Sequence, residues 1–200
     1  MVEPVLSDVV DPRPVEESRV VFEGAVWSVR QEAVDLGAGG VVVRDYVDHP
    51  GAVAVLALDA ADRVLLVRQY RHPVRSMCWE LPAGLRDVAG EEPLLTARRE
   101  LVEETAHAAA TWYELLDFHT SPGGSSEQLT VFLARDLGPV PEADRHEPEG
   151  EEVGMAVEWF GFDEVLEAVL AGRLTNPSLV AGVLAAAAHR AAGWTGLRPV

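Results

Sequence analysis

The sequence predicts an α/β fold with a mixed β-sheet. Alternating segments and apolar runs that predict strands lie between 19 and 70, one segment near 92–105 has apolar residues at helical spacing, and two further helical segments lie towards the C-terminus. Strands and helices are interleaved without strict β-α-β alternation. The sheet is therefore expected to contain both parallel and antiparallel neighbours.

The N-terminal part of the chain predicts a small β region. Residues 1–18 include an Asp-Pro-Arg-Pro stretch and are expected to form a flexible segment. Alternating residues separated by glycine-bearing turns then predict three short strands within 19–50. These strands are Arg19–Phe22, Val26–Val34 and Gly40–Val47.

A larger domain is predicted over 51–195, beginning with two core strands and a helix. The apolar runs Gly51–Leu58 and Arg63–Tyr70 indicate strands joined by a short turn. Proline and glycine predict a loop over Trp79–Gly84. A helix is expected over about 92–105, because a proline near its start suits the first helical turn.

The rest of this domain is predicted to add three strands and two helices. An acidic loop rich in proline and glycine, Glu142–Glu152, precedes the last of these strands. The final helix is rich in alanine, which has the highest helix propensity. The strands are expected around Trp112–Thr120, Leu129–Ala134 and Met155–Phe160, and the helices over Phe162–Ala171 and Pro177–Ala192.

Composition is that of a globular protein and argues against several kinds of partner. Of 200 residues, 48% are hydrophobic and 24% are charged, which is ordinary for a globular domain. A net charge of −17 argues against binding to nucleic acid or to an anionic membrane, because phosphates would be repelled. The single cysteine, Cys78, cannot form an intrachain disulfide, and no signal peptide is visible. A cytoplasmic protein is expected.

Three glutamates on the helix predicted near 92–105 indicate a possible metal site. Glu100, Glu103 and Glu104 are spaced so that their carboxylates project from one helical face. Like charges at this spacing destabilise a helix by about 0.2–0.5 kcal/mol per pair, and a hard cation such as Mg²⁺ would compensate directly. For such a cluster taken alone, a solvated acidic face without a ligand is the alternative.

The residues around this cluster resemble the Nudix box, Gly-x5-Glu-x7-Arg-Glu-apolar-x-Glu-Glu-x-Gly-apolar. The matching positions are Glu91, Arg99, Glu100, Leu101, Glu103 and Glu104. Gly84 lies one residue further upstream than the pattern requires, Ala106 replaces the late glycine and His107 replaces the last apolar residue. All the acidic positions are kept, so the chain is similar to the Nudix hydrolases.

The resemblance implies a Nudix-type α/β/α sandwich with a site for Mg²⁺, or for Mn²⁺. Glu100 and Glu104 are implied metal ligands, and Glu103 would bind directly or through water. The backbone carbonyl of Ala83 would complete the site, and Arg99 would orient the glutamates. Bound metal would neutralise a diphosphate and lower the pKa of a bound water.

Segments outside the box resemble the ADP-ribose pyrophosphatase branch of the family, especially its actinobacterial members. The stretch around Arg71 presents the implied substrate arginine, and Trp79–Leu85 leads into the box, with Leu85 as an implied substrate-binding residue. Ser121 begins a Ser-Pro-Gly-Gly segment that is followed by Glu127, and both residues match substrate-binding positions. Taken without the resemblance, Arg71 could be an ordinary surface arginine and the Ser-Pro-Gly-Gly segment a simple turn.

The acidic loop contains the implied general base. Counting back from Trp159, Glu152 matches the family's catalytic glutamate better than Glu151 does. Most acids in such a loop only interact with solvent, so both assignments depend on the resemblance. A positioned base would contribute roughly 10²–10⁴-fold to the rate.

The N-terminal strands resemble the small sheet that this branch exchanges between the subunits of a homodimer. The resemblance implies that an aromatic residue from this region stacks on adenine and that an arginine reaches the partner's site. Trp27 and Arg44 are the candidates, although exposed aromatic residues on a strand can equally be packing residues.

The resemblance predicts Mg²⁺-dependent hydrolysis of the pyrophosphate bond of ADP-ribose, giving AMP and ribose 5-phosphate. Glu152 would act as base, with Glu103 and Arg99 in the catalytic cluster. The box alone does not distinguish this substrate from another nucleotide sugar, such as GDP-mannose, or from a dinucleoside polyphosphate. A non-catalytic Nudix domain that senses ADP-ribose is the alternative from another functional class.

Overall fold

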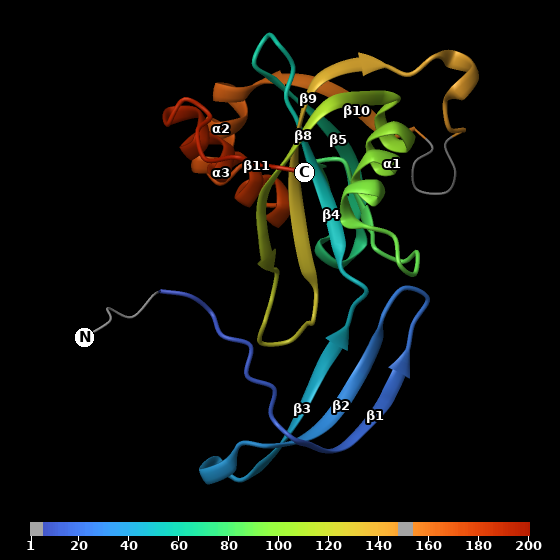
Figure 1. Ribbon diagram of the computed structural model, residues 1–200. Helices are drawn as coiled ribbons and strands as arrows, with labels where there is room; N and C mark the ends of the chain where they lie inside the picture. Colours follow the sequence, from blue (N-terminus) through green and yellow to red (C-terminus); the bar gives the residue numbers. More distant parts are fainter. Residues whose placement is uncertain (1–5, 148–153) are drawn as a thin grey trace. The chain divides into compact units, whose positions relative to one another are not determined.

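The computed structural model in Figure 1 describes residues 6–147 and 154–200, which form two compact units. The first unit contains the chain up to His49 together with the loop Ser121–Ser126. The second unit contains Pro50–Thr120 and Glu127–Val200. Every helix within the described ranges is too short or too polar to cross a lipid bilayer.

The first unit is built on an antiparallel sheet with strand order β1-β2-β3. Its strands are β1 (Val15–Glu23), β2 (Ser28–Asp35) and β3 (Val41–Asp48), with a short 3-10 helix η1 (Gly37–Gly39) between the last two. All three predicted strands are present. The first begins at Val15 rather than Arg19. The polar residues before Arg19 pair with β2, with a register shift between Val15 and Glu17, although they lack the apolar alternation that marks a strand in sequence.

The second strand begins later than predicted. Trp27, which was expected within this strand, lies in the turn before β2. The Trp27 carbonyl accepts a hydrogen bond from the Gly24 amide at 3.0 Å and closes this turn. The Trp27 ring lies against Phe22, with ring centroids 6.3 Å apart. The turn therefore presents the aromatic side chain at one end of the sheet.

The second unit contains a five-stranded sheet of order β11-β8-β9-β4-β7 and a three-stranded sheet of order β10-β5-β6. Strands β4 and β9 are parallel and the other paired strands are antiparallel, so the predicted mixed sheet is confirmed. The strands are β4 (Ala52–Ala57), β5 (Arg63–Arg71), β6 (Ser76–Glu80), β7 (Ala83–Leu85), β8 (His107–His119), β9 (Gln128–Pro139), β10 (Ala156–Gly161) and β11 (Arg198–Pro199).

The predicted loop over Trp79–Gly84 was wrong for most of its length. Trp79 and Glu80 end β6, whereas Ala83 and Gly84 begin β7. Both strands are short and flank a proline, a pattern that reads as a turn in sequence, yet each pairs with a long neighbouring strand. Strands β8 and β9 are likewise longer than their apolar segments, because they pair with each other along most of their length.

Helices cover both faces of β4, as Figure 1 shows, and this arrangement confirms the α/β/α architecture. Alternate β4 residues such as Val53 and Val55 pack in one buried cluster with Ala97 and Leu101. Their neighbours pack in a second cluster with side chains of the two C-terminal helices. A strand buried on both faces reads as a continuous apolar run, which is the pattern of 51–58. The helices are α1 (Pro93–Thr105), α2 (Phe162–Leu170) and α3 (Pro177–Ala191), with 3-10 turns η2 (His72–Val74) and η3 (Glu142–Asp144).

Helix α1, which carries the acidic cluster, begins and ends at defined positions. Glu92 has an extended backbone and Pro93 occupies the first turn, as predicted. At the other end Ala106 adopts a left-handed conformation with φ 53°, and its amide donates to the Val102 carbonyl at 2.9 Å. This is the position where the Nudix pattern has glycine, so the conformation is kept although the residue differs.

Candidate active site

Arg99 holds three glutamates of the box together. Its Nη1 donates to Glu100 Oε1 at 2.7 Å and to Glu103 Oε2 at 3.0 Å. Its Nη2 lies 3.4 Å from Glu91 Oε2, which also accepts from Thr96 Oγ1 at 2.8 Å. Helical spacing alone places Glu100 and Glu103 on one face of the helix. The Arg99 guanidinium joins Glu91 to them.

Strand β7 brings the backbone next to the acidic residues of α1. The Ala83 amide donates to Glu104 Oε2 at 2.9 Å. A Cβ placed on Gly84 would lie 2.0 Å from the Glu100 carboxyl carbon, so a side chain here would require the Glu100 carboxylate to move. Glycine leaves room for the carboxylate where it lies, although Gly84 is one residue out of the pattern's spacing.

Burial raises the pKa of Glu100, and the nearby carboxylates of Glu103 and Asp87 raise it further, while Arg99 lowers it. Burial disfavours the ionised form of this side chain, and one arginine does not fully offset that effect. An additional cation at this position would stabilise the carboxylate. The electrostatics are therefore those of a site that favours positive charge.

The donor chemistry here fits a hard divalent cation. Ala83 contacts Glu104, and Glu100 shares Arg99 with Glu103. Gly84, which follows Ala83, lies against Glu100, so all four implied metal-binding residues lie close together. Among the described residues no three acidic, histidine or cysteine side chains are already arranged around a common metal position. The carboxylates instead accept hydrogen bonds from Arg99 and from the Ala83 amide. Oxygen ligands of this kind suit Mg²⁺, which retains several water ligands.

Arg71 is held by a buried acid that sequence reasoning did not identify. Its Nε donates to Glu80 Oε1 at 2.9 Å and its Nη2 to Glu80 Oε2 at 2.7 Å, across neighbouring strands. The side chain of Glu80 is 3% exposed, whereas that of Arg71 is 44% exposed. A bidentate pair of this kind fixes the guanidinium plane and leaves one side of it accessible. The sequence offered one signal for Glu80: it precedes Leu81 and Pro82 in the segment that leads to the box.

Arg86 was also missed by the sequence reading. Its amide donates to the Gly51 carbonyl at 3.1 Å, and its side chain lies over Gly51. Its Nε is buried without a hydrogen-bond partner in the part of the chain that the structure describes. It follows Leu85 directly, and that half-buried residue ends β7.

The other predicted substrate residues are divided between the two units. Glu127, in the second unit, accepts a hydrogen bond from Thr120 Oγ1 at 2.5 Å. Ser121, Trp27 and Arg44 belong to the first unit, where Ser121 lies in an exposed loop. Arg44 is exposed on β3. The proposed base Glu152 and its alternative Glu151 lie outside the described residues.

Comparison with known proteins identifies the family of the chain. The model of the NUDIX domain matches residues 48–180. The chain is 44% identical over 168 residues to an ADP-ribose pyrophosphatase of Mycobacterium tuberculosis, covering 84% of this chain and 80% of that protein. It is 42% identical over 122 residues to an ADP-ribose pyrophosphatase of Bacillus subtilis, covering 61% of this chain and 65% of that protein.

A solved structure supports the fold. The crystal structure of an ADP compounds hydrolase superposes with a TM-score of 0.70 at 21% identity, covering 94% of this chain and 99% of that one. A family match across most of the chain and a close relative of similar length confirm the resemblance drawn from the box. The chain belongs to the Nudix family.

Proposed function

We propose that the protein hydrolyses the pyrophosphate bond of ADP-ribose to give AMP and ribose 5-phosphate. The observation that carries this proposal is the network of Arg99, Glu100 and Glu103 beside the backbone of Ala83 and Gly84. The substrate class is supported by the relatives named ADP-ribose pyrophosphatase, at 44% and 42% identity. A non-catalytic sensor has no need of every acidic position of the box, and all of them are present.

The residues proposed to hold Mg²⁺, or Mn²⁺, are Glu100, Glu104 and the Ala83 carbonyl, with Glu103 beside them. When bound, the metal would neutralise the diphosphate and stabilise negative charge on its phosphoryl oxygens. Arg99 keeps Glu100 and Glu103 together through Nη1, so their repulsion does not separate them. Gly84 leaves room for Glu100 against the strand.

Three further roles complete the proposal. Arg71, held in plane by Glu80, is oriented to donate to a phosphate or a ribose hydroxyl. Glu152 is proposed to accept the proton of the attacking water, on the basis of its position relative to Trp159. Leu85, Ser121 and Glu127 are proposed to contact the substrate.

A substrate panel tests the proposal. Purified protein is incubated with ADP-ribose, GDP-mannose and a dinucleoside polyphosphate, with Mg²⁺, with Mn²⁺ or with a chelator, and products are resolved by mass spectrometry in ¹⁸O-labelled water. We expect metal-dependent release of AMP and ribose 5-phosphate, with ADP-ribose giving the highest kcat/KM. The position of the label identifies the phosphorus that water attacks. A higher kcat/KM for GDP-mannose, the substrate named for a 31% identical relative from Pectobacterium atrosepticum, would overturn the substrate assignment.

The general base has its own test within the same assay. Glu152→Gln is expected to bind ADP-ribose normally and to lose at least two orders of magnitude in kcat, because the base contributes roughly 10²–10⁴-fold. Glu151→Gln is the matched control and should retain near-normal kcat. The opposite result would make Glu151 the base.

We propose further that the first unit pairs with a second copy of the chain to form a homodimer with exchanged N-terminal strands. No described residue of this unit is buried, and large apolar side chains on its strands are exposed. They include Val20 at 48%, Phe22 at 55%, Val41 at 50% and Val43 at 57%. Exposed apolar patches of this kind mark association surfaces. Trp27 is proposed to stack on adenine, and Arg44 is proposed to reach the site of the partner subunit.

A further inference from the structure

The loop Ser121–Ser126, between β8 and β9, is attached by its backbone to the end of β3. The Val47 amide donates to the Gly124 carbonyl at 2.9 Å, and the Ser126 amide donates to the Val47 carbonyl at 2.9 Å. Val47 and Ser125 thereby form a parallel β-bridge. This contact joins residues more than seventy positions apart in sequence, so local turn chemistry cannot account for it.

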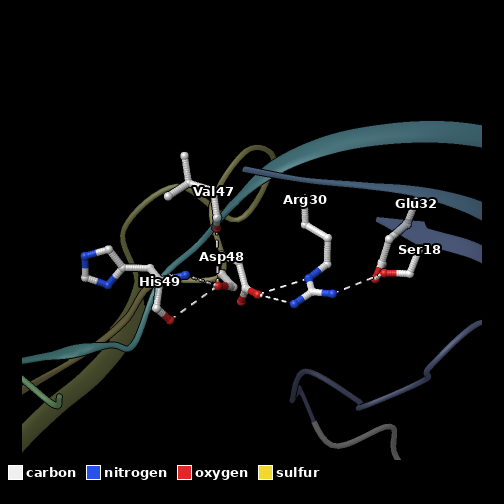
Figure 2. Close-up of polar contacts among 7 residues, drawn as sticks. Ser18, Arg30, Glu32, Val47, Asp48 and His49 are labelled. Atoms are coloured by element: carbon white, nitrogen blue, oxygen red, sulfur yellow. Dashed lines mark hydrogen bonds and ion pairs between the residues drawn. The ribbon is translucent and has the colours of Figure 1, made fainter. Parts of the chain in front are cut away.

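The Ser126 side chain reinforces the attachment. Its Oγ accepts from the His49 amide at 2.9 Å and lies within donating distance of the carbonyls of Val47 at 3.3 Å and His49 at 3.5 Å (Figure 2). One hydroxyl thus accepts from an amide and can donate to a carbonyl of the same short segment. A methyl group in its place would leave that amide without this acceptor.

The segment that receives Ser126 is itself fixed across the sheet. Asp48, between the two residues that Ser126 contacts, accepts from Arg30 Nε at 3.0 Å and Nη2 at 2.8 Å. Arg30 Nη1 continues to Ser18 Oγ at 3.3 Å, and Ser18 donates to Glu32 at 2.9 Å. Figure 2 shows this chain of polar contacts, which runs from β1 through β2 to the end of β3.

The other end of the loop is closed by its flanking residues. The Thr120 amide donates to the Glu127 carbonyl at 3.4 Å, and Thr120 Oγ1 donates to Glu127 Oε2. The loop is therefore held at its base by this pair and along its length by β3.

We infer that Ser126 is a positioning residue, which holds the loop on β3 and so fixes the position of Ser121 for its contact with the substrate. This inference rests on the proposed function for the role of Ser121. Ser126 acts through the loop backbone and needs no contact with substrate. Loss of its hydroxyl should therefore weaken substrate binding more than it slows the chemical step.

The test compares Ser126→Ala with Ser126→Thr, which keeps a hydroxyl, and with Ser7→Ala as the matched control. Ser7 is an exposed serine of the same unit that precedes β1 and belongs to neither the loop nor β3. The readouts are amide hydrogen exchange in peptides covering 44–49 and 120–128, the kcat and KM for ADP-ribose, and the thermal unfolding midpoint.

For Ser126→Ala we expect exchange in both peptides to rise about five- to tenfold, as loss of one hydrogen bond implies. KM should rise by a similar factor, with kcat within about twofold of the parent. Ser126→Thr should restore exchange and KM, and Ser7→Ala should leave both close to the parent values.

Unchanged exchange in Ser126→Ala would overturn the inference, because the hydroxyl would then not hold the loop. Faster exchange with an unchanged KM would overturn the positioning role. A fall in kcat and unfolding midpoint without a KM change would make Ser126 merely structural. Hydrogen exchange needs no substrate, so a parent protein that fails to hydrolyse ADP-ribose would refute the proposed function separately from the attachment of the loop.

Discussion

The two compact units differ in what stabilises them. The second unit has two buried apolar clusters, one on each face of β4, and its central strands are almost completely inaccessible to solvent. In the first unit every described side chain remains at least partly exposed, and the strands are joined by cross-strand polar contacts such as Arg19 with Gln31 and Arg30 with Asp48.

This difference indicates how each unit is expected to respond to substitution. Burial of apolar area supplies most of the free energy of folding, and a three-stranded sheet without a buried face has little of it. The second unit should tolerate changes to its acidic residues without unfolding. The first should depend on a surface that covers its apolar side chains.

The largest effect is expected at the acidic cluster, where a change should abolish activity and leave the fold intact. Glu104→Gln removes a proposed metal ligand but keeps an acceptor for the Ala83 amide. We expect Mg²⁺-dependent kcat for ADP-ribose to fall by at least about 10²-fold, with a circular dichroism spectrum like that of the parent. Glu158→Gln, at an exposed glutamate on β10, is the control and should retain activity. Near-normal turnover of Glu104→Gln would reject the assignment of Glu104 to the metal.

The next largest effect is expected in the first unit. It tests whether a second copy of the chain covers the exposed apolar side chains of this unit. Val43→Lys puts a charge on an exposed apolar residue of β3 and should shift the mass measured by light scattering from dimer to monomer at micromolar concentration. Leu170→Lys, which alters an even more exposed leucine at 71% on the second unit, should leave the mass unchanged. A parent protein that is already monomeric would refute the dimer.

A smaller effect is expected in the turn between β4 and β5, where the well-packed second unit also depends on charge. Burial alone would raise the pKa of Asp59, but hydrogen bonds from the Arg63 amide and guanidinium outweigh it, and the pKa lies below its usual 3.8. The folded state therefore binds a proton less readily than the unfolded state. The stabilisation is present above that usual value and is lost as the pH falls through the lowered one.

Asp59→Asn should accordingly lower the unfolding midpoint near neutral pH by about 2–4 °C, the shift that ~1 kcal/mol produces in a domain of this size. The difference from the parent should shrink as the pH is lowered towards about 3. Calorimetric scans of both proteins across this range measure it, with Glu158→Gln as control. A difference that is constant with pH would show that the charge of Asp59 is not involved.

The smallest effect is expected at the end of α1. Ala106 has a left-handed backbone, with φ 53°, which costs a residue with a Cβ about 1–2 kcal/mol relative to glycine. Ala106→Gly should raise the free energy of unfolding by about 1 kcal/mol, partly offset by the greater freedom of glycine in the unfolded chain. Urea titration of the two proteins measures the change. A destabilised variant would mean that the Ala106 side chain contributes packing that outweighs the backbone strain.

Sequence periodicity was sufficient to predict a strand or a helix whose own residues show the pattern. The apolar run at 51–58 and the helix with Pro93 in its first turn were predicted to within one residue or so of β4 and α1. Strands β6 and β7 were missed, because a short strand beside Pro82 owes its structure to a partner elsewhere in the chain.

The acidic cluster itself followed from helical spacing and from the box. The contact of Gly84 with Glu100 and the pairing of Glu80 with Arg71 did not, because each joins different elements and depends on the final packing. The attachment of the Ser121–Ser126 loop to β3 is of the same kind. Sequence spacing carries no information on such distant partners unless a resemblance supplies it.

The contact between Gly84 and Glu100 bears on how members of this family are recognised. Gly84 is fixed by the carboxylate that lies against it, and Glu91 is fixed by Arg99 and Thr96, so the connecting stretch need only reach from one to the other. An additional residue there alters neither anchor. Searches that require a constant interval between the glycine and the first glutamate would overlook such chains, whereas a criterion based on which atoms touch would find them.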